Sequence, residues 1–593
     1  MFIRKKFILK LAICLLYVVC ILIIAKTIKQ LSVENFFYPN ETYFPEETEH
    51  FLEKPSSVNS QFEKWLTSYE KEIIPNLGEN GKPSFLYGKE KLIAEMIKKK
   101  KAINVLLSNK ISLNRSLPDV RDELCQNVTY DEDDLPSASV VIIFFNEPLS
   151  VLLRTITSVI NGSPAKLLKE VIIVDDSSDE EELKGKLDYY ITKRLSKKVK
   201  IIRLPKRLGL IRARLAGARK STGDVLVFLD AHCEVITNWL EPLLQRIKDK
   251  NNAVLMPIID SISEDTLEYN HDNNPSFFQV GGFTWAGHFT WIDIQDKEKN
   301  RKTRISPVNS PTMAGGLFAI DRNYFWKIGS YDDKMDGWGG ENLEMSFRIW
   351  QCGGSLETIP CSRVGHIFRN FHPYKFPNNK DTHGINTARL VHVWMDDYKR
   401  LFLLYHDEFK YVDDTIGDLS ERIKLRNNLK CKNFKWYLDN VYPEKFIPDE
   451  NVIAYGRVKL RDTNYCLDNL QHDEDKPYNL GVYGCHSKLF PSQLFSLSNA
   501  GELRRDETCA IVKDEDVDEA KISTVKMIEC DSKSENNKWI LTKNGNIVHV
   551  ISGLCLDGTD IQDESDLFVK TCTDTTNQMW DFDYYVDSLK IGS

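Results

Sequence analysis

Two side chains suited to a transition metal stand together after an apolar run. Asp230 and His232 directly follow Val225–Leu229. Residues i and i+2 of an extended chain point the same way, so both side chains can reach one ion. A carboxylate with an imidazole suits Mn²⁺ better than Ca²⁺ or Mg²⁺, which prefer oxygen ligands. His366 could complete the site, although a lone His is more often structural and Asp230 could instead cap a helix near Asn238.

Other polar residues at the ends of apolar runs suit a nucleotide. Asp176 follows Val171–Val174 and could accept hydrogen bonds from a uracil or a ribose, or cap a helix that begins near Ser178. Arg207 and Arg214 lie around the expected start of another helix and could face a diphosphate. A solvated helix face is the alternative explanation for such a basic stretch.

Two glycine pairs could let the backbone approach a ligand closely. These are Gly315-Gly316 and Gly339-Gly340, although ordinary turns explain most such pairs. Glu341 follows the second pair and precedes a helical pattern that continues to Trp350. It is therefore a candidate sugar ligand or a favourable charge at a helix N-terminus.

The surrounding pattern predicts an α/β fold. Apolar strands alternate with helical patterns, which is typical of a parallel sheet covered on both faces. The predicted strands are 139–145, 171–174, 199–204 and 225–229, with helices through Asn161 and from Gly209. Ligands bind at the carboxyl ends of such strands. Asn146-Glu147, Asp175-Asp176 and Asp230-Ala-His232 all stand at these ends.

The last part of the chain predicts a second, all-β domain. Its cysteines fall into three pairs at near-equal spacing: Cys466 with Cys485, Cys509 with Cys530, and Cys555 with Cys572. Each unit also contains an aromatic residue at a matching offset, Phe495, Trp539 or Trp580. Three equal units, each with a local disulfide, predict a threefold trefoil barrel.

The N-terminus predicts a membrane anchor. Arg4, Lys5 and Lys6 precede the apolar stretch Phe7–Ala25, which is long enough to span a bilayer and is not followed by a small-residue cleavage site. The basic residues favour a cytoplasmic N-terminus. Residues 26–110 are expected to form a luminal stem with a helical pattern near 89–108. Sequons at Asn40, Asn114 and Asn127 and the cysteine pairs fit an oxidising compartment.

Length and charge narrow the class further. The chain has 593 residues, which exceeds one hydrophobic core, so at least two domains are expected. The formal net charge is -8, and neither Lys nor Arg forms a long run. We therefore expect no nucleic-acid partner.

Five longer motifs occur in order along the chain: Asp230-Ala-His-Cys-Glu, Ser310-Pro-Thr-Met-Ala-Gly-Gly-Leu-Phe-Ala-Ile, Trp338-Gly-Gly-Glu-Asn-Leu-Glu, Cys361-Ser-Arg-Val-Gly-His and Val393-Trp-Met-Asp-Asp-Tyr-Lys. Together they resemble the motifs of the polypeptide N-acetylgalactosaminyltransferases, which initiate mucin-type O-glycosylation. The resemblance runs from about Ser139 to the C-terminus. It implies transfer of N-acetylgalactosamine (GalNAc) from UDP-GalNAc to Ser or Thr of proteins, with retention of configuration. It also implies a type II Golgi membrane protein whose catalytic and lectin domains are luminal.

The family's organisation gives expected domain boundaries. These are a cytoplasmic tail (1–6), a transmembrane anchor (7–25), a stem (26–110), a GT-A catalytic domain (111–441), a linker (442–455) and a ricin-type lectin domain (456–593). The lectin domain is expected to bind GalNAc-bearing glycopeptides.

The resemblance also implies roles for individual residues. Mn²⁺ would be bound by Asp230, His232 and His366. The uridine part would be held by Asp176 and Arg207, and the sugar site lined by Arg214, Gly315, Gly316 and Glu341. The segment closing over the nucleotide would contain Trp338, Arg369, His372 and Tyr374. The expected catalytic residues are Asp230, Trp338 and Glu341. The family's catalytic-domain disulfides correspond to Cys125 with Cys361 and Cys352 with Cys431, which leaves Cys233 unpaired.

Two departures from the family pattern affect the nucleotide site. Phe145 stands where the family usually has a His that contacts the nucleotide, so a polar contact is lost and weaker UDP binding is expected. Pro377-Asn378-Asn379 replaces Pro-Gly-Gly and is expected to stiffen the closing loop. An alternative hypothesis is therefore a catalytically silent member that acts as a lectin for GalNAc-glycoproteins. Use of another UDP-sugar is a third.

The lectin repeats match the family's sugar-binding pattern unequally. The first has Asp468, Tyr483 and His486, with Ser492 where Asn is usual. The second lacks the Asp and is expected to be structural. The third keeps Asp557 and Asn577. The first and third repeats are therefore the expected sugar sites.

Overall fold

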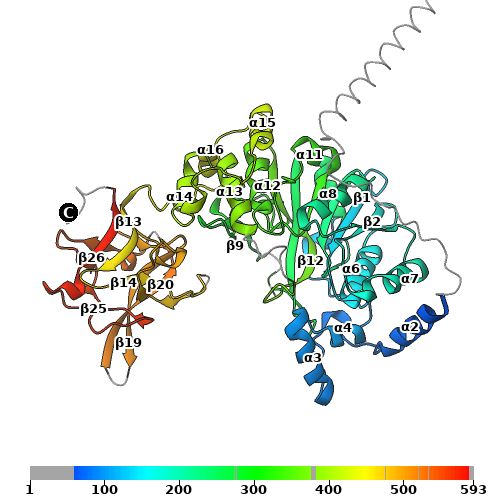
Figure 1. The fold of residues 1–593 in the computed structure, drawn as a ribbon, viewed down its shortest axis with the longest axis horizontal. Helices are drawn as coiled ribbons and strands as arrows, with labels where there is room; N and C mark the ends of the chain where they lie inside the picture. Colours follow the sequence, from blue (N-terminus) through cyan, green and yellow to red (C-terminus); the bar gives the residue numbers. More distant parts are fainter. Residues whose placement is uncertain are drawn as a thin grey trace, which may run out of the picture. The chain divides into compact units, whose positions relative to one another are not determined.

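The protein is described here by a computed structural model covering residues 59–586, apart from 273, 275–276, 375–381, 475, 518–519 and 532. The chain forms two compact units (Figure 1). The first comprises Met1–Gly282, Trp291–Thr387 and Leu419–Cys431; the second comprises Phe283–Thr290, Ala388–Asp418 and Lys432–Ser593. The predicted anchor (7–25), the sequon at Asn40 and the segment Pro377-Asn378-Asn379 lie outside the described residues. Among the residues described, no helix is long and apolar enough to cross a membrane.

A twisted sheet organises the first unit. In the described residues it has ten strands in the order β10-β12-β6-β11-β4-β1-β2-β3, with β5 beside β12 and β7 beside β6. The strands are β1 (Ala138–Phe144), β2 (Leu168–Asp175), β3 (Val199–Arg203), β4 (Val225–Asp230), β5 (Cys233–Val235), β6 (Ala253–Ile262), β7 (Tyr269–Asn270), β10 (Val308–Asn309), β11 (Phe318–Asp321) and β12 (Ser355–Ile367). Two short strands, β8 (Val280–Phe283) and β9 (Phe289–Ile292), follow β7 along the chain.

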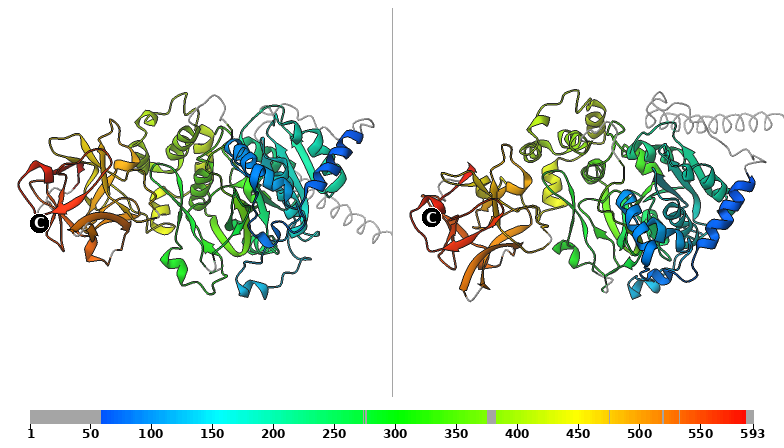
Figure 2. Two further views of the ribbon diagram at one scale, coloured as in Figure 1. Left: turned by 90° about the horizontal axis from the view of Figure 1, so that it is seen from below. Right: turned by 60° about the horizontal axis from the view of Figure 1, so that its bottom comes forward.

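Helices cover both faces of this sheet (Figures 1 and 2). The helices of the described chain are α2 (Asn59–Glu72), α3 (Gly88–Lys101), α4 (Val105–Lys110), α5 (Glu123–Gln126), α6 (Leu149–Gly162), α7 (Gly185–Arg194), α8 (Leu210–Lys220), α9 (Glu241–Asp249), α10 (Asp296–Lys299), α11 (Arg322–Lys327), α12 (Glu341–Gln351), α13 (Thr382–Trp394), α14 (Lys399–Leu403), α15 (Ser420–Asn428) and α16 (Phe434–Asn440). Of these, α14 and α16 belong to the second unit, and α13 runs from the first unit into the second. Strand alternation produces the two covered faces. Val140 and Ile142 of β1 belong to a buried cluster with Leu152 of α6. Val141 points to the opposite face, where it packs against Gly217 of α8. A Cβ on Gly217 would lie only 2.4 Å from Val141 Cγ1.

The strand directions correct one expectation. The strands β3, β2, β1 and β4 are parallel, as predicted. The next strand, β11, is antiparallel to both β4 and β6. The direction of β11 depends on the path of the long segment between β6 and β11. The pattern of apolar residues does not determine this path. Because β6 and β12 run parallel to β4, the carboxyl ends of β1, β2, β4 and β12 still share one edge.

Part of the predicted stem packs into the first unit. Helix α3 covers most of the predicted helical pattern and is followed by α4. Leu66 of α2 is fully buried in the main core cluster. Leu107 of α4 and Ile103, which precedes this helix, are fully buried in a second cluster. The packed body therefore begins well before residue 111.

The second unit contains the trefoil. Its strands are β13 (Val452–Leu460), β14 (Tyr465–Asp468), β15 (Tyr478–Asn479), β16 (Gly481–Gly484), β17 (Phe495–Ser498), β18 (Leu503–Arg504), β19 (Thr508–Val517), β20 (Ala520–Glu529), β21 (Trp539–Leu541), β22 (Ile547–His549), β23 (Cys555–Asp557), β24 (Ser565–Asp566), β25 (Phe568–Lys570) and β26 (Trp580–Tyr585). Phe495, Trp539 and Trp580, the predicted repeat aromatics, share one buried cluster. The indoles of Trp539 and Trp580 donate to the backbone oxygens of Ala510 and Leu556, which follow equivalent cysteines.

Five disulfides are present among the described residues. They join Cys125 to Cys361, Cys352 to Cys431, Cys466 to Cys485, Cys509 to Cys530, and Cys555 to Cys572. The first two are the pairs that the resemblance implied, and the last three are the pairs predicted from cysteine spacing. Cys233 is a buried free thiol.

Candidate active site

Three potential metal ligands converge at the shared sheet edge. Asp230 ends β4, His232 follows it, and His366 lies near the end of β12. Each offers a ligand atom within 4.8 Å of the others. Asp230 Oδ2 lies 3.3 Å from His366 Nε2, and the two imidazole centroids are 4.7 Å apart. Strand β5 brings the two segments together by pairing Cys233 with His366.

The donor set fits a divalent cation. Burial would raise the pKa of Asp230, but the hydrogen bond from His366 and the charge of Arg214 hold that pKa well below its usual range. Burial and Arg369 lower the pKa of His232, so its imidazole is neutral and can act as a ligand. The buried Nδ1 of His366 has no hydrogen-bond partner among the described residues. An ionised carboxylate with two imidazoles therefore suits Mn²⁺.

A buried ion pair supports His232 from behind. Glu147, which follows β1, accepts a hydrogen bond from Arg369 Nη2. Its Oε2 lies 3.5 Å from His232 Nδ1, and Arg369 Nη2 lies 2.9 Å from the same nitrogen. Burial would raise the pKa of Glu147, but Arg369 and His232 lower it to about 2. Glu147 was not among the predicted site residues, and its strand-end position was the only sequence signal for it.

Arg214 links the metal ligands to the predicted sugar site. It is almost fully buried on α8, with Nη2 3.4 Å from Asp230 Oδ1 and Nη1 3.6 Å from Glu341 Oε1. Glu341 is also buried at the start of α12 and accepts a hydrogen bond from the Gly339 N–H. Burial raises the pKa of Glu341. The position of Glu341 therefore fits both expected roles. It lies at a helix N-terminus, where its charge is favourable, and it faces the site, where it could bind the sugar.

The predicted glycines make room for these groups. A Cβ on Gly316 would lie 2.5 Å from Asp230 Oδ2. Gly315 has φ of +89°, and a Cβ there would lie 2.6 Å from the Asn342 Cβ. Any side chain at either position would displace its neighbour.

Aromatic residues line the side of the site formed by the predicted closing segment. Trp338 is 41% exposed, and its ring centroid lies 5.2 Å from that of His372. The His372 and Tyr374 centroids are 5.7 Å apart. Arg369 belongs to the same segment but points to Glu147.

Asp176 and Arg207 lie next to each other beyond β2 and β3. The Asp176 carboxylate accepts hydrogen bonds from the backbone N–H groups of Leu208 (2.7 Å) and Gly209 (2.9 Å). Burial nevertheless raises its pKa to about 6. The alternative role near Ser178 belongs to Asp175, whose Oδ1 accepts from the Ser178 N–H. Asp176 therefore fixes the loop that carries Arg207.

A cavity opens beside the metal ligands. Its volume is about 420 Å³, and its lining includes Asp260, Arg363, Phe278, Trp291 and Phe368. Phe368 stands two residues after His366, and Met313 and Ala314 extend the lining to the glycine pair. The cavity combines apolar walls with a buried ion pair between Arg363 and Asp260.

The first trefoil repeat has a buried carboxylate and an exposed aromatic side chain. Asp468 accepts from the Leu470 N–H and the Ser492 hydroxyl. Tyr483 is 37% exposed, and its ring stacks on His486 at 5.7 Å.

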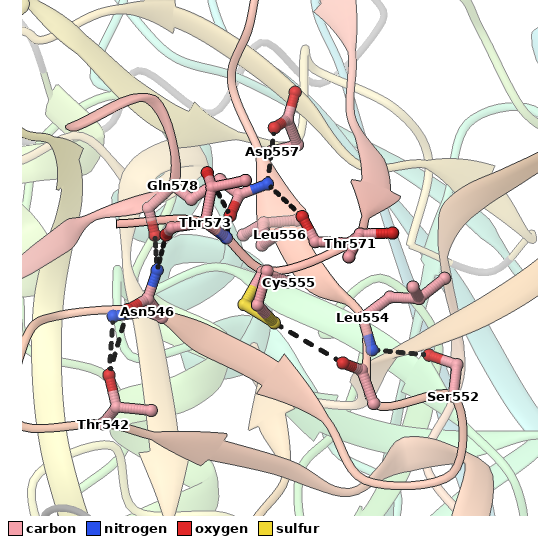
Figure 3. Close-up of a disulfide and its surroundings, with 12 residues drawn as sticks. Thr542, Asn546, Ser552, Leu554, Cys555, Leu556, Asp557, Thr571, Thr573 and Gln578 are labelled. Atoms are coloured by element: carbon pink, nitrogen blue, oxygen red, sulfur yellow. Dashed lines mark hydrogen bonds between the residues drawn. A yellow bond between two sulfur atoms is a disulfide. The ribbon is translucent and has the colours of Figure 1, made fainter. Parts of the chain in front are cut away.

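The third repeat differs at the same register. Lys570, which stands two residues before the second cysteine as Tyr483 does, lies 2.8 Å from Asp557 Oδ1. Gln578 donates to Asp557 Oδ2 (Figure 3). Asn577 is exposed. The predicted sugar-binding Asp of this repeat is thus already paired with a cation of its own chain.

The nucleotide-type sheet edge, the metal donor set and the trefoil together define a metal-dependent glycosyltransferase with an attached lectin domain. Residues 139–325 match glycosyl transferase family 2, residues 302–373 match the N-terminal domain of galactosyltransferase, and residues 454–580 match the ricin-type beta-trefoil lectin domain.

The relatives narrow this class to one family. The chain is 47% identical over 512 residues to probable N-acetylgalactosaminyltransferase 9 of Caenorhabditis elegans, covering 85% of this chain and 86% of the relative. It is 45% identical over 507 residues to polypeptide N-acetylgalactosaminyltransferase 13 of Homo sapiens, covering 85% and 88%. The crystal structure of GalNAc-T7 with UDP, GalNAc and Mn²⁺ is 34% identical, with a TM-score of 0.65 and coverage of 87% and 94%. The chain belongs to the polypeptide N-acetylgalactosaminyltransferase family.

Proposed function

We propose that this enzyme transfers GalNAc from UDP-GalNAc to Ser and Thr hydroxyls of proteins. The observation that carries the proposal is the convergence of Asp230, His232 and His366 beside the buried Arg214–Glu341 pair. The similarity to GalNAc-T7, whose structure contains UDP, GalNAc and Mn²⁺, supports the choice of donor and metal.

The charges of the site suit departure of a nucleoside diphosphate. Bound Mn²⁺ would offset the negative charge that develops on the leaving phosphate. Asp230, His232 and His366 would hold the metal, and Arg207 would bind the nucleotide. The Arg214 guanidinium lies between Asp230 and Glu341 and attracts both carboxylates, so it would help to fix both side chains before the donor arrives.

Retention of configuration without a covalent intermediate is part of the proposal. Glu341 is held by Arg214 and the Gly339 N–H, so its role would be to orient the sugar. The acceptor hydroxyl would attack from the face that the phosphate leaves, and the phosphate would take the hydroxyl proton. The cavity lined by Phe278, Trp291 and Phe368 would take the acceptor peptide, and its apolar walls support this choice.

Attachment to the Golgi membrane and luminal orientation also belong to the proposal. The basic residues before the apolar stretch Phe7–Ala25 support a type II anchor. The five disulfides support an oxidising compartment. The first trefoil repeat would bind GalNAc already present on an acceptor.

The test is transfer of GalNAc from UDP-GalNAc to naked and GalNAc-bearing peptides by residues 31–593 secreted without the apolar stretch. We expect transfer that requires Mn²⁺, that EDTA stops, and that Asp230→Ala abolishes. Other UDP-sugars serve as donor controls. A folded protein that binds GalNAc but transfers nothing would replace this proposal with the lectin hypothesis.

A further inference from the structure

An aromatic and cationic cluster forms where three distant segments meet. The Arg207 guanidinium lies 3.8 Å from the centroid of the Phe145 ring, over its face. It also lies 5.3 Å from the Tyr374 centroid. Phe145 and Tyr374 meet edge to face, with centroids 6.1 Å apart. Phe145 follows β1, Arg207 precedes α8, and Tyr374 follows β12.

The backbone on either side of the cluster is held firmly. Asn146, next to Phe145, has φ of +50°, donates its N–H to the Ser178 hydroxyl and accepts from the Asp179 N–H through its side chain. The residues after Arg207 are held by Asp176 through two backbone hydrogen bonds. The backbones that carry the ring and the guanidinium are therefore both anchored to the loop that follows β2.

Stacking suits a guanidinium that must still bind a ligand. The face of a stacked guanidinium rests on the ring, and its N–H donors lie in the plane of the group rather than against the ring. A stacked Arg has lost rotamer freedom before the ligand arrives, so less is lost on binding. The Arg207 side chain is half-buried, and its contact with the Phe145 ring restricts its orientation.

We propose that Phe145 is a positioning residue that orients Arg207 toward the nucleotide of the donor. This inference rests on the proposed function. It reverses the expectation that Phe145, in place of the usual His, weakens UDP binding. The π face of Phe stabilises the guanidinium, whereas imidazole is a poorer partner and repels Arg207 when protonated.

The experiment measures Kd of UDP in saturating Mn²⁺ by calorimetry, with residues 31–593. Phe145→Leu keeps apolar volume but removes the π face. We expect about a three- to tenfold weaker Kd, and a rise in the donor KM that exceeds any fall in kcat. Phe145→Tyr retains a π face and should bind UDP as tightly as the wild type. Phe85→Leu removes an exposed Phe at another place and is the matched control.

Phe145→His gives the decisive comparison because the two hypotheses predict opposite signs. We expect weaker UDP binding than in the wild type, and equal or tighter binding would overturn the proposal. Unchanged Kd in Phe145→Leu would also overturn it. If Phe145→Leu does not fold, the His and Tyr variants carry the test. A wild-type protein that binds no UDP would instead refute the proposed function itself.

Discussion

Replacing Glu147 by Gln tests how the buried ion pair supports the metal site. The substitution preserves the shape of the side chain but removes the charge that balances Arg369. Arg369 Nη2 would remain 2.9 Å from His232 Nδ1, and its positive charge would then act on the site without compensation. Burial and, after it, the charge of Arg369 already lower the pKa of His232, and Glu147 opposes this effect.

The expected result is weaker binding of Mn²⁺. Partners that orient a metal-bound His are worth about 10- to 100-fold in metal affinity. This corresponds to about 1.4–2.7 kcal/mol of binding free energy. The near-complete burial of Glu147 at 5% exposure favours the upper part of this range, because water cannot replace the lost charge.

The assay is calorimetric titration of chelator-treated protein with Mn²⁺, followed by transfer rates at low and high Mn²⁺. Excess metal should restore most of the Glu147→Gln activity. Glu344→Gln is the matched control, because Glu344 is an equally buried carboxylate paired with arginines, Arg348 and Arg422, and does not contact the metal ligands. Unchanged Mn²⁺ affinity in Glu147→Gln, or an equal change in Glu344→Gln, would refute the reasoning.

Three further predictions concern other parts of the molecule. Gly316→Ala places a Cβ against Asp230 and should weaken Mn²⁺ binding about 5- to 100-fold, measured by the same titration. Burial raises the pKa of Glu344, but Arg348 and Arg422 lower it from 4.5 to about 2, so its ionised form stabilises the fold by about 3 kcal/mol above pH 4.5. That contribution is lost as pH falls from about 4.5 to 2, so the unfolding free energies of wild type and Glu344→Gln should converge in urea titrations at low pH. Asp468→Ala should weaken GalNAc binding about 10- to 100-fold by calorimetry, while Asp557→Ala should change it little.

Each of these three predictions has its own control or contradicting result. Gly484→Ala, whose added Cβ has its nearest neighbour at 3.6 Å, should leave Mn²⁺ binding unchanged. A pH-independent stability difference for Glu344→Gln would contradict the ion-pair assignment. Loss of GalNAc binding in Asp557→Ala with retention in Asp468→Ala would show that the third repeat is the sugar site.

The sequence predicted the features whose signal is local. Apolar runs located the first four strands, and the residues just after them included Asp230 and His232. Cysteine spacing located the trefoil disulfides. His366 was placed at the site by resemblance, since a lone His carries no local signal of its partners.

Features that depend on distant contacts were not predictable in this way. Glu147 became a site residue only because β12 brings Arg369 to it. Asp176 proved to hold the Leu208 and Gly209 backbone, and no local pattern pairs a carboxylate with N–H groups so far along the chain. The reversed direction of β11 likewise follows from the path of the chain between strands.

In the proposed lectin role, the ion pair between Lys570 and Asp557 would set the valency of the trefoil. A repeat whose carboxylate is paired with a lysine of its own chain would add no second contact with a densely modified acceptor. With one open repeat, neighbouring sugars would compete for the same place and would raise the rate of rebinding without adding simultaneous contacts. Release from each sugar would then be as fast as from an isolated sugar, which would let the enzyme move along such an acceptor.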